Sequence, residues 1–142
     1  MHREIGTNKS MKISYLINPD LKPREVVTLF VNSGIKRPVN NVGRIKRMVE
    51  NANLIICAKN DKKLVGILRA VTDFSYCCYV SDLAVDKKYQ RLGIGKKLLK
   101  LAQKTLGKDV MMLLLSAPEA DSFYFHIGME NIQNAWKIAR KR

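Results

Sequence analysis

The chain has 142 residues, of which 46% are hydrophobic, and its formal net charge is +14. This length suits one domain, and this apolar content excludes a generally disordered chain. The longest apolar runs have the length of a strand, which excludes a membrane-spanning helix, and the N-terminus lacks the apolar core of a signal peptide. We therefore expect one domain over residues 11–142, a flexible tail over residues 1–10, and a cytoplasmic location.

Taken in chain order, the periodicity of apolar residues predicts alternating strands and helices. Strands are predicted at residues 12–17, 54–59, 64–72, 76–85 and 110–115, with a closing strand at 131–138. Helices are predicted at residues 23–33, 42–49 and 94–106, and a fourth helix begins at a capping box made by Ser116 and Glu119. Three successive strands followed by helix, strand and helix indicate a mixed α/β sheet, antiparallel at first and parallel later.

Two of these segments carry more specific expectations. The run at residues 110–115 is continuously apolar, which is typical of a strand buried on both faces. The loop at residues 35–37, between the first two helices, is expected to be a solvated connection. The cysteines Cys57, Cys77 and Cys78 lie in apolar runs without metal-ligand spacing, so we expect buried thiols in a reducing compartment and no metal site.

The net charge of +14 has three explanations: a nucleic acid, a polyanionic cofactor, or a basic surface without a special partner. Lysines are spread along the chain, and aromatic residues are not interleaved with them as they are in a base-stacking surface. We therefore do not expect specific nucleic-acid recognition. A membrane partner is not expected either.

The stretch from Val80 to Leu99 is the most informative part of the chain. It begins as a strand, passes through a polar segment and enters a helix just after Gly93. Glycine at 93 and 95 leaves backbone N–H groups uncovered where the helix starts, and Arg91, Lys96 and Lys97 add positive charge. The N-terminus of a helix binds anions, so this stretch predicts a diphosphate site.

The spacing of this loop decides between known phosphate motifs. Gln90 stands where a P-loop needs glycine, and Leu98 stands where a dinucleotide fingerprint needs glycine or alanine. The pattern Gln90-x-x-Gly93-x-Gly95 between a strand and a helix resembles the acetyl-CoA motif of the GNAT superfamily of N-acetyltransferases. A second match is Phe123-Tyr124-x-x-x-Gly128. Residues 64–73 with Ser81-Asp82 also resemble the serotonin-type (arylalkylamine) branch.

This resemblance implies a GNAT-like mixed sheet whose two parallel central strands splay apart around the pantetheine arm of acetyl-CoA. It implies cofactor contacts through the following residues: Leu83, Ala84, Val85, Gln90, Arg91, Leu92, Gly93, Ile94, Gly95 and Lys96. Tyr124 is implied as the acid that protonates the leaving thiolate. For the base, Asp82 is the first candidate, with Asp73 and Glu119 as others, and His126 is expected at the surface.

We therefore expect an N-acetyltransferase that transfers acetyl from acetyl-CoA to a primary amine by direct attack in a ternary complex. The amine belongs to a small molecule, a lysine side chain or a protein N-terminus. Family resemblance also allows a homodimer, and it makes the loop at residues 35–37 a candidate substrate-facing segment. Two alternatives stay open: an acyl-CoA sensor without turnover, and a basic protein associated with RNA or the ribosome.

Overall fold

The computed structural model describes residues 4–8 and 12–141 and contains one sheet in the spatial order β1-β2-β3-β4-β5-β6. The strands are β1 (Glu4–Asn8), β2 (Ile13–Ile17), β3 (Leu54–Asn60), β4 (Lys63–Thr72), β5 (Cys77–Val85) and β6 (Met111–Leu114). Neighbouring strands are antiparallel except β5 and β6, which are parallel. The mixed α/β sheet expected from the sequence is confirmed.

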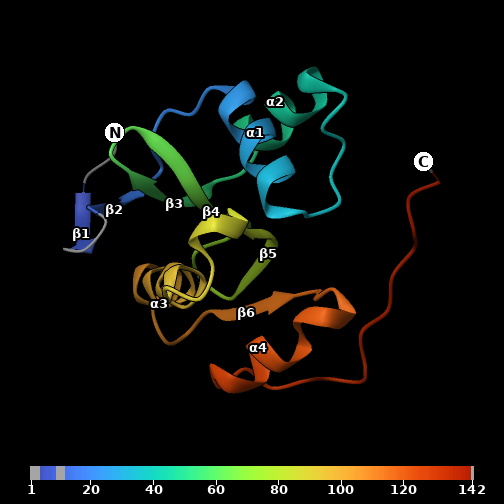
Figure 1. Ribbon diagram of the computed structural model, residues 1–142. Helices are drawn as coiled ribbons and strands as arrows, with labels where there is room; N and C mark the ends of the chain where they lie inside the picture. The colour runs from blue at the N-terminus through green and yellow to red at the C-terminus, as the bar shows by residue number, and fades with distance from the viewer. Residues whose placement is uncertain (1–3, 9–11, 142) are drawn as a thin grey trace.

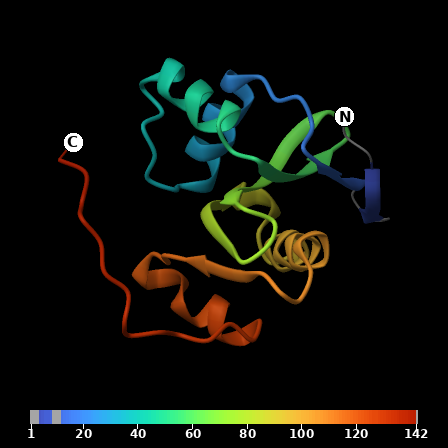
Figure 2. The same cartoon turned by 180° about the vertical axis from the view of Figure 1, so that it is seen from behind.

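Helices cover both faces of this sheet. Helices α1 (Pro23–Ser33) and α2 (Val42–Glu50) lie on one face, and α3 (Ile94–Leu106) lies on the other (Figure 1). The short α4 (Asp121–His126) follows β6 and lies below it in the view from behind (Figure 2), and a Cβ on Gly95 of α3 would lie 3.2 Å from the Phe123 ring of α4. Among the described residues, no helix combines the length and the apolar character needed to cross a bilayer.

The centre of the sheet is buried on both sides because helices pack against each face. Within β3, Leu54 and Ile56 join the apolar core under α3, whereas Ile55 and Cys57 join the core under α1 and α2. Successive side chains of a strand point to opposite faces, so a strand covered twice is apolar at every position. This explains the uninterrupted apolar run of β3.

Strand β5 contains a bulge at Ser81. Arg69 of β4 pairs with Asp82, whereas the next residue, Ala70, pairs with Val80, so Ser81 has no partner of its own. A bulge of this kind inserts one residue and changes the face to which the following side chains point. The pairing register of β4 and β5 locates this bulge.

The bulge separates the two parallel strands. Val80 still packs in the core under α3, whereas Ala84 packs in the core under α1 and α2. The pairing of β5 with β6 reaches Val80 opposite Leu114 and ends there. Beyond Ser81, none of the described residues pairs with β5 on its β6 side, as in the splayed pair that the family resemblance implies.

Part of the expected N-terminal tail forms a strand. Residues Glu4–Asn8 make β1, which pairs antiparallel with β2 and places Thr7 opposite Ser14. The strand covers backbone groups of β2 that would otherwise form an open edge. Polar residues and a glycine make up most of β1, so no apolar alternation marks it in the sequence. The remaining tail positions, 1–3 and 9–11, lie outside the described residues.

The prediction of a closing strand at residues 131–138 is wrong. This segment has no strand pairing and runs away from the sheet (Figure 1), and its Trp136 and Ile138 side chains are 95% and 99% exposed. Without a neighbour there, β6 stays at the edge of the sheet. The expectation that residues 110–115 are buried on both faces is therefore wrong as well, since Met111 is 59% exposed.

Two smaller expectations also need correction. Ser116 and Glu119 do not form a capping box: residues Pro118–Ala120 make a 3-10 turn, α4 begins at Asp121, and the Ser116 hydroxyl donates to Asp121 Oδ1 over 2.6 Å. Cys57 and Cys78 are buried as expected, but Cys77 is exposed. Cys77 is the first residue of β5 and lies next to the β4–β5 turn.

Candidate active site

The loop from Gln90 to Gly95 connects the 3-10 turn η1 (Lys87–Tyr89) to α3 and is anchored at both ends. The side-chain amide of Gln90 donates to the carbonyl of Val85, the last residue of β5, over 3.1 Å. At the other end Ile94 is buried in the core and contacts Gly66 of β4, where a Cβ would lie 3.0 Å from its methyl group. Ile94 therefore contributes its backbone N–H to the site while its side chain holds the loop.

Two residues of this loop have left-handed backbone conformations. Arg91 has φ +67° and Gly93 has φ +80°. The first hydrogen bond of α3 runs from the Lys97 N–H to the Gly93 carbonyl. Within the described part of the chain, none of the N–H groups of residues 91–96 donates a hydrogen bond.

This arrangement fits a diphosphate. Free N–H groups at a helix N-terminus carry partial positive charge and favour anions. The side chains of Arg91 and Lys96 are exposed beside them, whereas the Lys97 ammonium lies 5.8 Å from the ring centre of Tyr15. The cofactor contacts of residues 91–96 stay a prediction.

Gly95 has a second reason to be glycine, which the sequence did not indicate. A Cβ at this position would lie 3.2 Å from the Phe123 ring, so the ring of α4 packs directly on the backbone of α3. This contact joins the two motifs that the sequence analysis treated as independent. It also brings the next residue, Tyr124, to the side of the sheet that carries the loop.

Tyr124 is half-buried on the α3 side of the sheet. Its ring makes an edge-to-face contact with Phe123, with 5.1 Å between ring centres, and it packs against the same core as Leu83 and Val85. Burial raises the pKa of the Tyr124 phenol. Its hydroxyl therefore stays protonated at neutral pH, as a proton donor must. His126, at the end of α4, is exposed as expected.

The predicted base residues do not gather around Tyr124. Asp82 is buried, and its carboxylate accepts from Arg37 and Arg69 on the α1–α2 side of the sheet. Glu119 is exposed in the turn before α4. Neither arginine was predicted as a partner of Asp82. A usable signal was present, since Arg69 and Asp82 are opposite charges inside two adjacent apolar strands.

Asp73 organises the turn between β4 and β5. Its Oδ1 accepts hydrogen bonds from the backbone N–H groups of Tyr76, Ser75 and Cys77 at 2.7, 2.8 and 3.1 Å. These bonds, led by that of Tyr76, lower the pKa of Asp73 to about 2. A carboxylate with so low a pKa is a poor proton acceptor near neutral pH. Asp73 is therefore better explained as a residue that stabilises the turn than as the base.

The lowered pKa of Asp73 predicts a pH dependence of stability. Because the folded-state pKa of about 2 lies below the usual 3.8, the stabilisation is complete above that usual value and is lost as the pH falls towards 2. Urea unfolding between pH 2 and 5 should therefore lose stability more steeply for the wild type than for Asp73→Asn. Asp20→Asn is the control, and identical slopes for the wild type and Asp73→Asn would refute the role.

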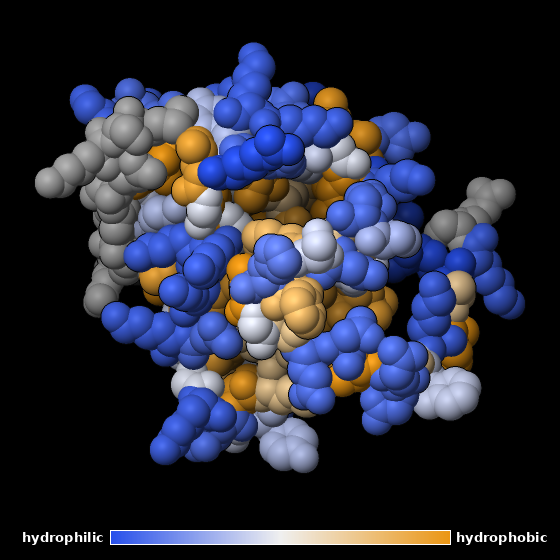
Figure 3. All heavy atoms as spheres, turned by 60° about the horizontal axis from the view of Figure 1, so that its bottom comes forward, coloured by the Kyte–Doolittle hydropathy of each residue, from blue (hydrophilic) through white to orange (hydrophobic). Residues whose placement is uncertain are grey.

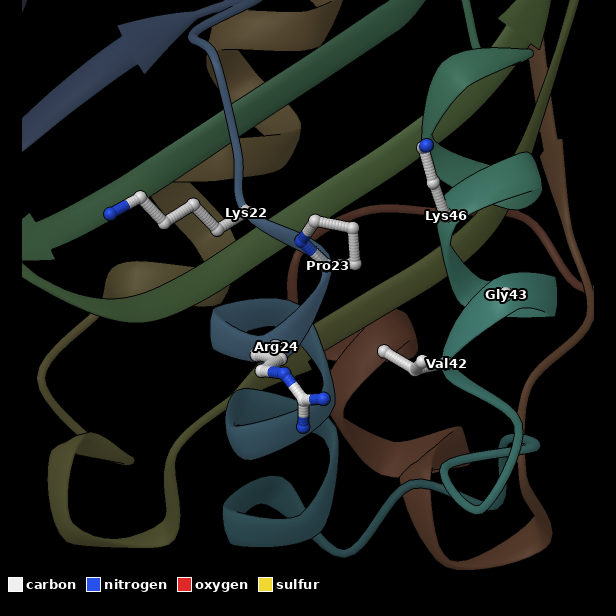
Figure 4. Close-up of a pocket in the computed structure, with 6 residues that line it drawn as sticks. All are labelled: Lys22, Pro23, Arg24, Val42, Gly43 and Lys46. Carbon is white, nitrogen blue, oxygen red and sulfur yellow. The ribbon is translucent and has the colours of Figure 1, made fainter.

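A hollow on the surface lies outside this site. An open hollow between the first turns of α1 and α2 is lined by Lys22, Pro23, Arg24, Val42, Gly43 and Lys46. Figure 4 shows that its three basic side chains point in different directions, so they do not converge on one ligand. Across residues 4–8 and 12–141, no cluster of three or more His, Cys, Asp or Glu side chains could hold a metal ion.

The chain matches the acetyltransferase (GNAT) domain family over residues 23–137. This range includes the bulged β5, the loop at residues 90–95 and α4, and it covers most of the chain. The chain therefore belongs to the GNAT acetyltransferase family. Membership of the arylalkylamine branch is a finer distinction that this match does not make.

Two curated relatives are similar to part of this chain. GCN5-related N-acetyltransferase 2, chloroplastic, of Arabidopsis thaliana is 35% identical over 74 residues, which are 51% of this chain and 29% of the relative. The uncharacterized N-acetyltransferase ycf52 of Pyropia yezoensis is 30% identical over 100 residues, 66% of this chain and 56% of the relative. The chain thus spans about half or less of the length of these relatives.

Solved structures share the fold. A GNAT-family acetyltransferase of Streptococcus pneumoniae superposes with a TM-score of 0.70 at 24% identity, covering 91% of this chain and 99% of that chain. Aminoglycoside N-acetyltransferase AAC(6')-Iy in complex with CoA superposes with a TM-score of 0.64 at 13% identity, covering 100% of this chain and 95% of that chain. At these identities the likeness concerns the fold.

Proposed function

We propose that this chain transfers the acetyl group of acetyl-CoA to a primary amine by direct attack in a ternary complex. The observation that carries the proposal is that three features lie together: the free N–H groups of residues 91–96, the end of β5 that pairs with β4 but not with β6, and Tyr124. An anion site, a gap between parallel strands and a proton donor are what a phosphate-bearing thioester needs.

Each part of the site has a distinct task. The N–H groups of residues 91–96 bind the diphosphate, and the backbone of residues 83–85 at the strand gap binds the pantetheine amides. Acetyl-CoA supplies an activated thioester. The amine nitrogen bonds to its carbonyl carbon as the carbon–sulfur bond breaks, the sulfur leaves with the electron pair, and Tyr124 Oη gives its proton to that sulfur. The amine proton passes to water, and the Tyr124 phenolate takes a proton back from water.

The cysteines support direct attack over an acyl-enzyme. Cys57 lies in the core under α1 and α2, where burial raises the pKa of its thiol to about 12. Cys78 is buried as well, and burial also raises the pKa of its thiol. Protonated thiols are weak nucleophiles. Exposed Cys77 lies at the start of β5, before the bulge and the strand gap.

A thiol-release assay with a panel of amines tests the proposed function. Arylalkylamines come first because of the resemblance of residues 64–73, followed by aminoglycosides, lysine-containing peptides and peptides with free N-termini. We expect amine-dependent release of CoA thiol with at least one class. Saturable acetyl-CoA binding without turnover on any amine would favour the sensor instead. Salt-sensitive RNA binding without any effect of CoA would favour a nucleic-acid role.

We also propose that the chain forms a homodimer through the open edge of β6. Apolar side chains are exposed both there, at Met111 and Leu115, and on the terminal segment, at Trp136 and Ile138. Figure 3 shows apolar side chains between hydrophilic ones on the face that carries α3 and α4. Sedimentation should give a dimer that Trp136→Asp weakens, and a wild-type monomer at micromolar concentration would exclude it.

A further inference from the structure

The carboxylate of Asp82 is enclosed by two arginines from different parts of the fold. Its Oδ1 accepts from Arg37 Nε at 2.6 Å, and its Oδ2 accepts from Arg69 Nε at 2.5 Å. The side chain of Asp82 is 0% exposed, that of Arg69 is 9% exposed and that of Arg37 is 28% exposed. Charge-assisted hydrogen bonds of this kind are among the strongest that side chains make.

Both guanidinium groups also bind the bulge itself. Arg37 Nη2 donates to the carbonyl of Ser81 over 2.8 Å, and Arg69 Nη2 donates to the hydroxyl of Ser81 over 2.8 Å. The bulged residue is therefore bound through its backbone by one arginine and through its side chain by the other. We call Arg37, Arg69, Asp82 and Ser81 the arginine clamp.

The remaining donors of the clamp reach the helical layer. Arg37 Nη1 donates to the carbonyl of Lys36 over 2.6 Å, within the loop that joins α1 to α2. Arg69 Nη1 donates to the carbonyl of Met48, near the end of α2, over 3.2 Å. The clamp thus connects the bulge of β5 to the loop and the helix above it. Among residues 35–37, Lys36 is exposed, whereas Ile35 and Arg37 are half-buried, so most of this loop is not simply solvated.

We propose that Arg37, Arg69 and Asp82 are positioning residues that hold the β5 bulge, and with it the gap between β5 and β6, in one geometry set by the α1–α2 loop. The inference rests on the proposed function, because the gap is where the backbone of residues 83–85 binds the pantetheine arm. Movement of the loop then changes cofactor binding through the bulge.

This role differs from that of a general base. A base must come within hydrogen-bond reach of the substrate amine, directly or through one water. The Asp82 side chain has no exposed surface, and both of its oxygens face guanidinium groups. It also lies on the α1–α2 side of the sheet, whereas Tyr124 lies on the α3 side. Asp82 acts through the strand that it holds.

Hydrogen exchange of Arg37→Gln tests the clamp without any ligand. Arg37 is the partner to change, because its partial exposure and the intact Arg69–Asp82 pair let the variant fold. Amides of residues 81–85 and of the loop at 35–40 should both exchange roughly tenfold faster or more. Arg44→Gln is the matched control, since Arg44 is half-buried on α2 and its guanidinium makes no hydrogen bond within the described residues. Faster exchange in the loop alone would overturn the clamp.

Titration with CoA and steady-state kinetics then test the link to the proposed function. Arg37→Gln should weaken CoA binding about three- to tenfold. Arg37→Lys should recover part of the loss, because lysine keeps the positive charge but lacks the branched guanidinium donors. Asp82→Asn should lower kcat/KM without changing the shape of its pH profile, whereas loss of a base would remove the acidic limb. If the wild type binds no CoA, the proposed function fails, while hydrogen exchange still decides the clamp.

Discussion

Replacement of Gly93 by valine is expected to weaken acetyl-CoA binding about 10²-fold or more and to leave the fold in place. Gly93 has φ +80°, and a Cβ built there meets nothing within 4 Å, so the position is open to a side chain. A β-branched residue is strained in the left-handed region, and the loop must change its backbone to relieve the strain. Loss of two hydrogen bonds to a charged phosphate, at about 1.5–3 kcal/mol each, accounts for this size of effect.

Gly107→Val is the matched control for this prediction. Gly107 ends α3, has φ +86° and likewise offers open space around a Cβ. Both variants carry the same side chain at opposite ends of one helix, and the strain is larger at Gly107, where ψ is 173° against 10° at Gly93. Gly107→Val should lower the melting temperature yet bind acetyl-CoA with wild-type affinity. Equal loss of affinity in the two variants would mean that the loop is not the diphosphate site.

Tyr124→Phe should lower kcat by roughly 10²–10³-fold while the dissociation constant of acetyl-CoA stays within about twofold, which is the range for loss of a positioned acid. Phenylalanine keeps the half-buried ring and its edge-to-face contact with Phe123 at 5.1 Å. What is lost is the hydroxyl proton that the leaving sulfur needs. Unchanged kcat would remove Tyr124 from the reaction.

The pH profile provides an independent check on Tyr124. Burial raises the pKa of its phenol, so the competent, protonated form persists through neutral pH and into the alkaline range. Ionisation of Tyr124 should therefore cause no fall in kcat below about pH 10. Tyr15→Phe is the control, because burial also raises the pKa of Tyr15 and its ring lies 5.8 Å from the Lys97 ammonium, outside the strand gap. Activity should survive that substitution.

The parts of the fold that follow from local chemistry could be predicted from the sequence. Pro23 and Gly34 bound α1, Asn41 caps α2 by accepting from the Arg44 N–H, and Gly93 begins α3. Each of these signals acts within a few residues of its cause. The loop of residues 90–95 could be recognised for the same reason, since glycine spacing, strand and helix all lie in one continuous stretch.

Features that depend on distant partners could not be predicted in this way. The bulge at Ser81 requires the register of β4 against β5, and the clamp requires Arg37, which lies 45 residues before Asp82. The sequence placed Asp82 correctly on β5 but could not supply its partners, so it appeared as a free carboxylate. The predicted closing strand at residues 131–138 is wrong because a strand also needs a neighbour to pair with, and nothing in the described chain pairs with this segment.

A calorimetric titration of the wild-type chain with acetyl-CoA tests the central claim most directly. The account predicts saturable binding at one site per chain, because one loop of free N–H groups and one strand gap share the α3 side of the sheet. The affinity for acetyl-CoA should fall as salt is added, because salt screens the attraction between the phosphates and the basic site. Absence of binding at millimolar acetyl-CoA would contradict the account.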